Sequence, residues 1–119
     1  ENINFYSLQN GFGREQIKKF KCEDFIIDFY GEIDQIPFKD TLSIIKCLDL
    51  VISVDTSIAH ISATLRKKTW LMLPFDPDFR WGLKNEKSIW YENIILFRQN
   101  KIESWENVLL KIKKLLENK

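Results

Sequence analysis

Residues 50–54 (LVISV) constrain the fold more than any other part of the chain, because four of these five side chains are apolar and three are β-branched. A run of this kind is typical of a strand that is covered on both faces, as in a parallel sheet. Asp55, Thr56 and Ser57 follow without a spacer, and all three residue types are favoured at helix N-termini. The sequence therefore predicts a central parallel strand that leads directly into a helix over residues 58–65.

Weaker signals predict that strands and helices alternate along the rest of the chain. Short aromatic and aliphatic runs that end at turn residues indicate strands at 2–8, 25–30, 69–73 and 93–97. Apolar residues at helical spacing indicate helices at 14–21, at 41–48 with Asp40 as N-cap, and at 104–117 with Ser104 as N-cap. Residues 74–90 have no clear period and predict a long loop with one helical turn. Strands that alternate with helices pair in parallel, so we expect one α/β domain over residues 1–119.

The composition argues against several classes of partner. The 18 basic and 17 acidic side chains nearly cancel, so no net field would attract nucleic acid or an anionic membrane. No segment approaches the roughly 20 apolar residues of a membrane span, and residues 1–10 lack the features of a signal peptide. Cys22 and Cys47 lack the spacing of a metal site or a disulfide framework. We expect a cytoplasmic domain with free, buried thiols and no bound metal.

The turn at residues 53–60 (SVDTSIAH) is the first candidate site, because ligands of an open parallel sheet bind beyond the carboxyl ends of its strands. A helix that starts there presents unpaired amides and the positive end of its dipole, which suit a phosphate. Thr56 and Ser57 add hydroxyl donors, and His60 lies one turn further along. Alternatively, Asp55 or Thr56 only caps the helix, and His60 is packed or solvated.

Two further segments are candidate ligand sites. The turn at residues 9–15 (QNGFGRE) has two glycines after a strand but lacks the third glycine of a dinucleotide fingerprint. Either its backbone approaches a ligand closely, or the glycines only permit a tight turn. The aromatic loop at residues 74–81 (PFDPDFRW) sets rings beside Asp76, Asp78 and Arg80, a combination that suits a sugar or a base. The same rings can also seal the edge of the sheet.

Four segments together resemble a known family. In order and spacing, residues 5–17, 49–81, 88–99 and 104–112 resemble the C-terminal half of heptosyltransferase-like (family 9-like) glycosyltransferases of the GT-B type. The resemblance is strongest to bacterial members that are fused to tetratricopeptide repeats, and it covers nearly the whole chain. It implies a Rossmann-like, three-layer α/β/α domain with a mainly parallel sheet of about five strands, which binds a nucleotide-diphosphate-sugar donor.

Carried over by position, the resemblance assigns roles to particular residues. It implies that the diphosphate and sugar of the donor contact Asp55, Thr56, Ser57 and His60. It places the nucleoside near Gln9, Gly11 and Glu15, and more loosely near Asp40 and Thr41. Apart from the resemblance, the composition of the aromatic loop makes Phe75, Asp78, Arg80 and Trp81 candidates for a sugar or acceptor loop. We expect no metal and no cofactor, because the helix dipole and hydroxyl donors can stabilise the leaving diphosphate. The resemblance argues against a heptose donor, because Ser57 stands where heptosyltransferases usually have glycine.

Two parts of the family pattern do not occur in this sequence. Family members carry the acceptor site and the catalytic base in an N-terminal domain, and their C-terminal domain begins with one more central strand. We therefore expect a fragment of a longer protein that is inactive alone, and that either rearranges its sheet or self-associates through an unpaired strand. The alternatives are a non-catalytic nucleotide- or protein-binding module and a purely structural α/β domain.

Overall fold

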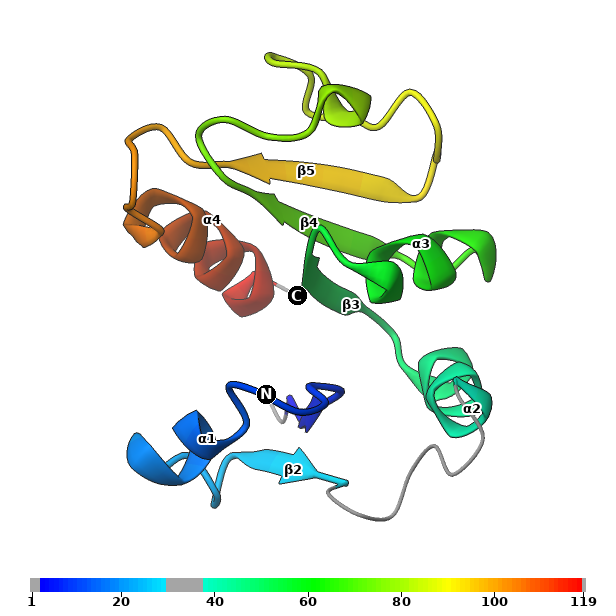
Figure 1. Ribbon diagram of the computed structural model, residues 1–119, viewed down its shortest axis with the longest axis vertical. Coiled ribbons are helices and arrows are strands. Elements are labelled where there is room, and N and C mark those ends of the chain that lie inside the picture. Colours follow the sequence, from blue (N-terminus) through cyan, green and yellow to red (C-terminus); the bar gives the residue numbers. More distant parts are fainter. Residues whose placement is uncertain (1–2, 30–37, 119) are drawn as a thin grey trace. The chain divides into compact units, whose positions relative to one another are not determined.

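The computed structural model describes residues 3–29 and 38–118 and has the expected α/β fold with parallel strands. The chain forms two compact units, Glu1–Ile44 and Ile45–Lys119, and each is described by itself. Figure 1 shows the five strands and four α-helices of the described residues in order along the chain. The strands form a sheet of two and a sheet of three, and every strand pair is parallel. This arrangement is compatible with a Rossmann-like fold.

The first unit contains a parallel pair of strands joined through a short helix. Strand β1 (Phe5–Ser7) pairs with β2 (Ile26–Asp28), and α1 (Glu15–Lys19) lies between them in sequence. The helix is tied to β2 by an ion pair of 2.6 Å between Arg14 and Asp28. Helix α2 (Lys39–Cys47) spans the boundary between the two units.

The second unit contains the larger sheet, in the order β3-β4-β5. Its elements are β3 (Val51–Val54), α3 (Ser57–Thr64), β4 (Thr69–Leu73), the 3₁₀ turn η1 (Phe79–Trp81), β5 (Ile94–Arg98) and α4 (Glu106–Glu117). The helical turn expected within residues 74–90 is therefore confirmed as η1. The strand expected at residues 69–73 is β4.

A helix covers each face of this sheet, because successive side chains of a strand point to opposite faces. On one face, Leu71 and Leu73 of β4 pack in the same buried cluster as Ala59 and Ala63 of α3. On the other face, Trp70 packs in a second cluster that includes the α4 residues Val108 and Ile112. The second unit is therefore a three-layer α/β/α arrangement, as expected.

In the sheet that the described residues of the second unit form, β3 lies at an edge, whereas we expected residues 50–54 to form the central strand. The central strand is β4, in which four of five residues are buried. Val54 at the end of β3 is 43% exposed. The apolar pattern of residues 50–54 resembles that of a central strand because the start of β3 is buried, with Val51 only 3% exposed.

The predicted N-caps of two helices and the predicted burial of the two cysteines also differ from the structure. Helix α2 begins at Lys39, so Asp40 lies in the first turn of the helix and not at its cap. Trp105, not Ser104, occupies the N-cap of α4, and it makes no side-chain hydrogen bond to the helix. Both cysteines are free, but Cys22 is only half-buried and Cys47 is exposed.

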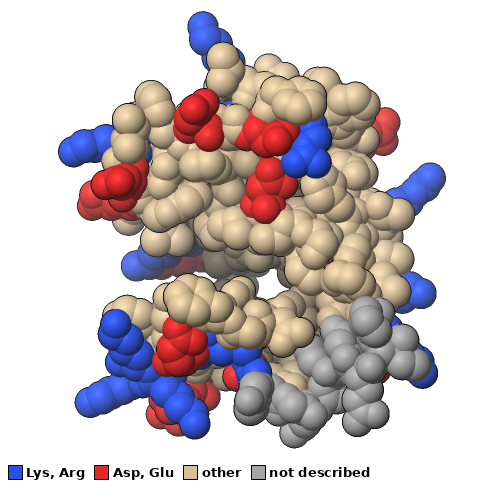
Figure 2. Space-filling model, viewed as in Figure 1, with Lys and Arg blue, Asp and Glu red and all other residues tan. Residues whose placement is uncertain are grey.

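The surface carries charges of both signs. On the face shown in Figure 2, acidic and basic side chains are interspersed, and neither sign forms a continuous patch. Within residues 3–29 and 38–118, no helix is both long and apolar enough to cross a bilayer.

Candidate functional site

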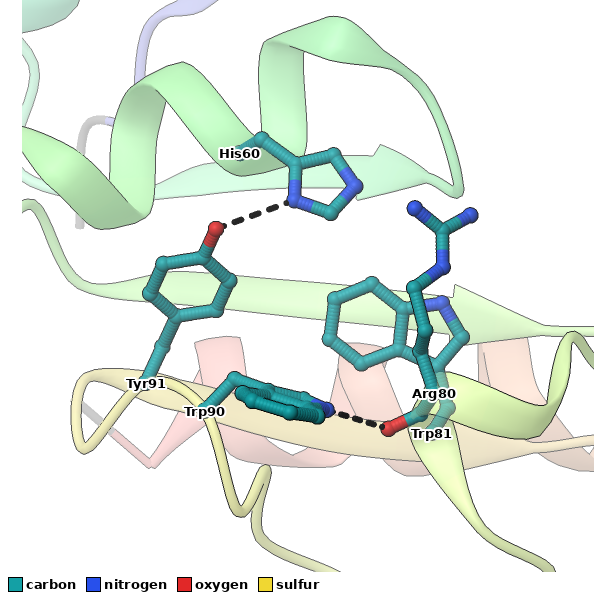
Figure 3. A pocket seen from close by; sticks show the side chains of 5 residues that line it. All are labelled: His60, Arg80, Trp81, Trp90 and Tyr91. Atoms are coloured by element: carbon teal, nitrogen blue, oxygen red, sulfur yellow. Dashed lines mark hydrogen bonds between the residues drawn. The ribbon is translucent and has the colours of Figure 1, made fainter.

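A cavity of about 360 Å³ lies in the second unit, beside the helix that follows β3. Its walls come from α3, from η1 and from the segment before β5, and they consist of His60, Arg80, Trp81, Trp90 and Tyr91. Figure 3 shows the His60 ring above the cavity, the Trp90 ring below it and the Arg80 side chain reaching up towards α3. The cavity thus combines three aromatic rings with an imidazole and a guanidinium group.

The carboxylate of Asp55 links the elements around this cavity. Asp55 follows β3 directly, and its Oδ2 accepts a hydrogen bond of 2.9 Å from Nε1 of the buried Trp81. The same carboxylate lies 3.6 Å from Nε2 of His60 and 3.8 Å from the guanidinium of Arg80. Asp55 therefore holds η1 against α3, and its charge faces two basic groups.

No side chain caps the start of α3. Thr56 occupies the N-cap in an extended conformation, with φ −140° and ψ 172°, but makes no side-chain hydrogen bond to the helix. Its hydroxyl lies 3.2 Å from the hydroxyl of Ser53 instead. Thr56 therefore occupies the cap position, as the alternative expected, but without the hydrogen bond of a side-chain cap. The first amides of α3 keep the partial positive charge that favours anions at a helix N-terminus.

Both ring nitrogens of His60 face polar partners. Nδ1 lies 3.1 Å from the hydroxyl of Tyr91, and Nε2 faces Asp55. The ring also packs against Trp81 and Tyr91, with centroids 5.5 Å and 5.9 Å apart. These contacts fix the plane of the imidazole, so His60 is neither a simple core residue nor a freely solvated one.

Asp78 orients Arg80. Asp78 Oδ1 accepts hydrogen bonds from the backbone N–H of Arg80 at 3.0 Å and from its Nε at 2.8 Å. Hydrogen bonding to Arg80 lowers the pKa of Asp78, and the same side-chain bond raises the pKa of Arg80. Because Nε is occupied, the terminal amino groups of the guanidinium are the part that points towards the cavity.

Arg98, the last residue of β5, and the next residue, Gln99, hold the two ends of the aromatic loop. At its start, Gln99 Oε1 accepts a hydrogen bond of 3.0 Å from the backbone N–H of Phe75. At its end, the Arg98 guanidinium donates to the carbonyl oxygens of Trp81, Gly82 and Asn85. Burial lowers the pKa of Arg98. Gly82 is suited to this tight turn because its φ is +62°, a backbone conformation that glycine adopts without strain.

Comparison with protein-family models, with curated proteins and with solved structures gave no match. The resemblance to GT-B glycosyltransferases therefore stays a prediction.

The structure brings together most of the candidates that lie in the second unit. Asp55, His60, Asp78, Arg80 and Trp81 are connected by the contacts described above. Thr56 and Ser57 lie at the start of α3. Phe75 is 52% exposed and does not line the cavity, although its amide anchors the aromatic loop.

Three contributors were not predicted from the sequence. Trp90 and Tyr91 line the cavity, and Arg98 holds the end of the aromatic loop. The sequence feature that could have indicated Trp90 and Tyr91 is that they are adjacent aromatic residues shortly before a strand. The segment around them has neither a helical nor a strand period. No local pattern marks Arg98, because its partners are carbonyl oxygens 13 to 17 residues earlier in the chain.

The candidates of the first unit lie in a turn and in a helix. Gly11 and Gly13 have φ of +72° and +95°, which a tight turn requires. Glu15 accepts a hydrogen bond from the Gly13 amide at 3.0 Å, and Gln9 donates to the carbonyl of Phe12 at 2.8 Å. These contacts are those of the tight-turn alternative, and the nucleoside role of Gln9, Gly11 and Glu15 stays a prediction.

The remaining candidates lie in α2. Asp40 is in its first turn, and Thr41 is 4% exposed. A role of either residue beside the base also stays a prediction. Within the described part of the chain, no group of three or more His, Cys, Asp or Glu side chains is placed to hold a metal ion.

Proposed function

We propose that this chain binds a nucleotide-diphosphate-sugar and forms part of the donor-binding domain of a glycosyltransferase. The proposal rests on one observation: the uncapped start of α3 lies beside a cavity that contains a guanidinium, an imidazole and aromatic rings. The sequence resemblance to GT-B glycosyltransferases supports the same reading. The cavity adds Trp90 and Tyr91, to which the resemblance assigned no role.

The start of α3 is the proposed position of the diphosphate. Backbone amides at a helix N-terminus point towards an anion and carry partial positive charge. The hydroxyl of Ser57 adds a donor at this end of the helix. The negative charge of Asp55 does not prevent binding, because it accepts from Trp81 and faces Arg80 at 3.8 Å and His60 at 3.6 Å.

These groups would act on the leaving group of a sugar transfer. When the bond between the anomeric carbon and the diphosphate breaks, negative charge develops on the phosphate oxygens. Donors that are already oriented towards these oxygens stabilise that charge and lower the barrier. A site of this composition needs no metal ion for this step. The acceptor site and the catalytic base lie outside the proposal, and we expect no turnover by this polypeptide alone.

A pair of variants at Ser57 tests the phosphate contact. Ser57→Ala removes the hydroxyl but keeps the amide, whereas Ser57→Pro removes both. Proline is well tolerated at the first position of a helix, and the extended conformation of Thr56 is the one that a residue before proline prefers. Both variants are therefore expected to fold, and they differ at the proposed phosphate donor.

The experiment is a titration of the protein with UDP, GDP and ADP and with their glucose or mannose conjugates, followed by amide chemical shifts. We expect shifts centred on residues 55–60 for at least one nucleotide. Ser57→Pro is expected to weaken that binding roughly 10- to 100-fold, the cost of one hydrogen bond to a charged group, and Ser57→Ala much less. Absence of shifts at millimolar concentrations of every nucleotide would favour a purely structural domain.

A further inference from the structure

We propose that the cavity lined by His60, Arg80, Trp81, Trp90 and Tyr91 takes the sugar part of the donor, that this sugar is a neutral hexose, and that one face of its ring lies against Trp90. This inference rests on the proposed function, since it assigns two parts of the donor to two neighbouring places in the second unit. The diphosphate lies at the start of α3, and the sugar occupies the aromatic cavity.

The size of the cavity favours one ring over a whole nucleotide-sugar. Pockets for small molecules occupy about 300–1,000 Å³, so a cavity of about 360 Å³ lies near the lower limit. A single hexose ring fits a space of this size, whereas a nucleoside, a diphosphate and a sugar together do not. The rest of the donor must lie outside the cavity.

The charges around the cavity favour a neutral occupant. Arg80 is the permanent positive charge in its lining, and two carboxylates already face it: Asp78 at 2.8 Å and Asp55 at 3.8 Å. A uronic acid would place its carboxylate inside the cavity, close to both of these carboxylates, whereas the diphosphate lies outside the cavity, and like charges repel. Sugar hydroxyls, in contrast, both donate to carboxylates and accept from a guanidinium.

Trp90 offers an exposed aromatic face to this occupant. Its side chain is 63% exposed, whereas that of Trp81 is 2% exposed and belongs to the core. The indole N–H of Trp90 donates to the carbonyl oxygen of Arg80 at 3.0 Å, which fixes the ring below the cavity (Figure 3). Since the polar atom of the indole is occupied, the ring face is what remains for a ligand, and the C–H face of a hexose matches such a surface.

The imidazole of His60, the hydroxyl of Tyr91 and the guanidinium of Arg80 come from three different elements (Figure 3). A hexose carries hydroxyl groups around its whole ring and can use all three. A nucleobase presents its polar atoms only along its edge, and this distribution favours the sugar over the base.

Free methyl glycosides test this inference without the nucleotide. The probes are the methyl glycosides of glucose, galactose and mannose, together with those of glucuronic and galacturonic acid as charged counterparts. The readout is the set of four indole N–H resonances in a ¹⁵N-labelled sample. Trp90 and Trp81 line the cavity, whereas Trp70 and Trp105 belong to the opposite face of the sheet and serve as internal references.

At least one neutral glycoside is expected to shift the Trp90 and Trp81 resonances saturably, while Trp70 and Trp105 stay in place. The uronates are expected to bind at least about fivefold more weakly. Trp90→Ala is expected to lose about fivefold to tenfold in affinity, the size of one aromatic stacking contact, and Trp90→Phe is expected to keep most of it. Phe79→Ala is the matched control, since Phe79 is 88% exposed on η1 but does not line the cavity.

Several results would overturn the inference. It fails if no neutral glycoside shifts Trp90, if the uronates bind as well as the hexosides, or if Trp90→Ala binds them unchanged. It also fails if UDP, GDP or ADP alone shifts Trp90 and loses affinity in Trp90→Ala, because the cavity then holds the base. Nucleotide shifts at residues 55–60 without hexoside binding leave the proposed function intact. Hexoside binding without any nucleotide shift overturns the proposed function, and with it the assignment of the hexose to a nucleotide-sugar donor, but not the hexose site itself.

Discussion

Replacement of Arg98 by lysine tests how the aromatic loop is held. The guanidinium of Arg98 donates to three carbonyl oxygens, those of Trp81, Gly82 and Asn85. Lysine keeps the charge and most of the length of the side chain, but its single ammonium group cannot reach three acceptors that are spread along the guanidinium fork. Arg98→Lys therefore removes about two hydrogen bonds without removing the charge.

The expected cost follows from these contacts. A hydrogen bond from a charged donor contributes about 1.5–3 kcal/mol, and two lost bonds at the lower limit would cost about 3 kcal/mol. Arg98 and its acceptors are only partly buried, so water replaces some of what is lost, and we expect a decrease of about 2 kcal/mol in the free energy of unfolding. Urea denaturation measures this decrease.

Hydrogen exchange locates the effect. The amides of Trp81 and Gly82 are bonded within the turn η1, to the carbonyls of Asp78 and Phe79, and are expected to exchange faster in Arg98→Lys. Arg66→Lys serves as the control, since Arg66 is an exposed residue in the segment between α3 and β4. If the two variants unfold within about 0.5 kcal/mol of each other, the normal range for surface substitutions, the assigned role of Arg98 is refuted.

Three further predictions concern the core and the site. Leu71→Ala, at a fully buried position of the central strand, is expected to cost about 2–5 kcal/mol in urea denaturation. Trp81→Phe removes the hydrogen bond to Asp55 and is expected to cost at least about 1.5 kcal/mol in the same assay. Because Arg80 lowers the pKa of Asp78, the contribution of this pair to stability is present above the ordinary pKa of aspartate and is lost as the pH falls through the lowered value. In a ¹³C titration, Arg80→Gln is expected to raise the pKa of Asp78 towards its ordinary value.

The fold class could be predicted because its signals are local. Alternating apolar runs and helical spacing indicated the parallel α/β arrangement, and β4 has the predicted bounds. The order of the strands could not be predicted in the same way. Residues 50–54 and 69–73 are both apolar, and only their pairing partners determine that β4 is central and β3 an edge.

The site could be predicted where a strand leads directly into a helix. This rule indicated Asp55, Thr56, Ser57 and His60, and the structure places them at the expected turn. It did not indicate that Asp55 would bind an indole N–H instead of capping α3, because Trp81 lies 26 residues away in sequence. Contacts over such distances depend on how the loop crosses the sheet, which no local pattern records.

The anchoring of the aromatic loop has a consequence for engineering. Gln99 binds the backbone N–H of Phe75, and Arg98 binds backbone carbonyl oxygens, so both anchors are independent of the side chains between them. Residues 76, 77 and 79 can therefore be randomised as a library on an unchanged scaffold, whereas Asp78 and Arg80 stay fixed because their hydrogen bonds hold η1. Selection from such a library would alter which molecules the chain accepts while the sheet beneath stays the same.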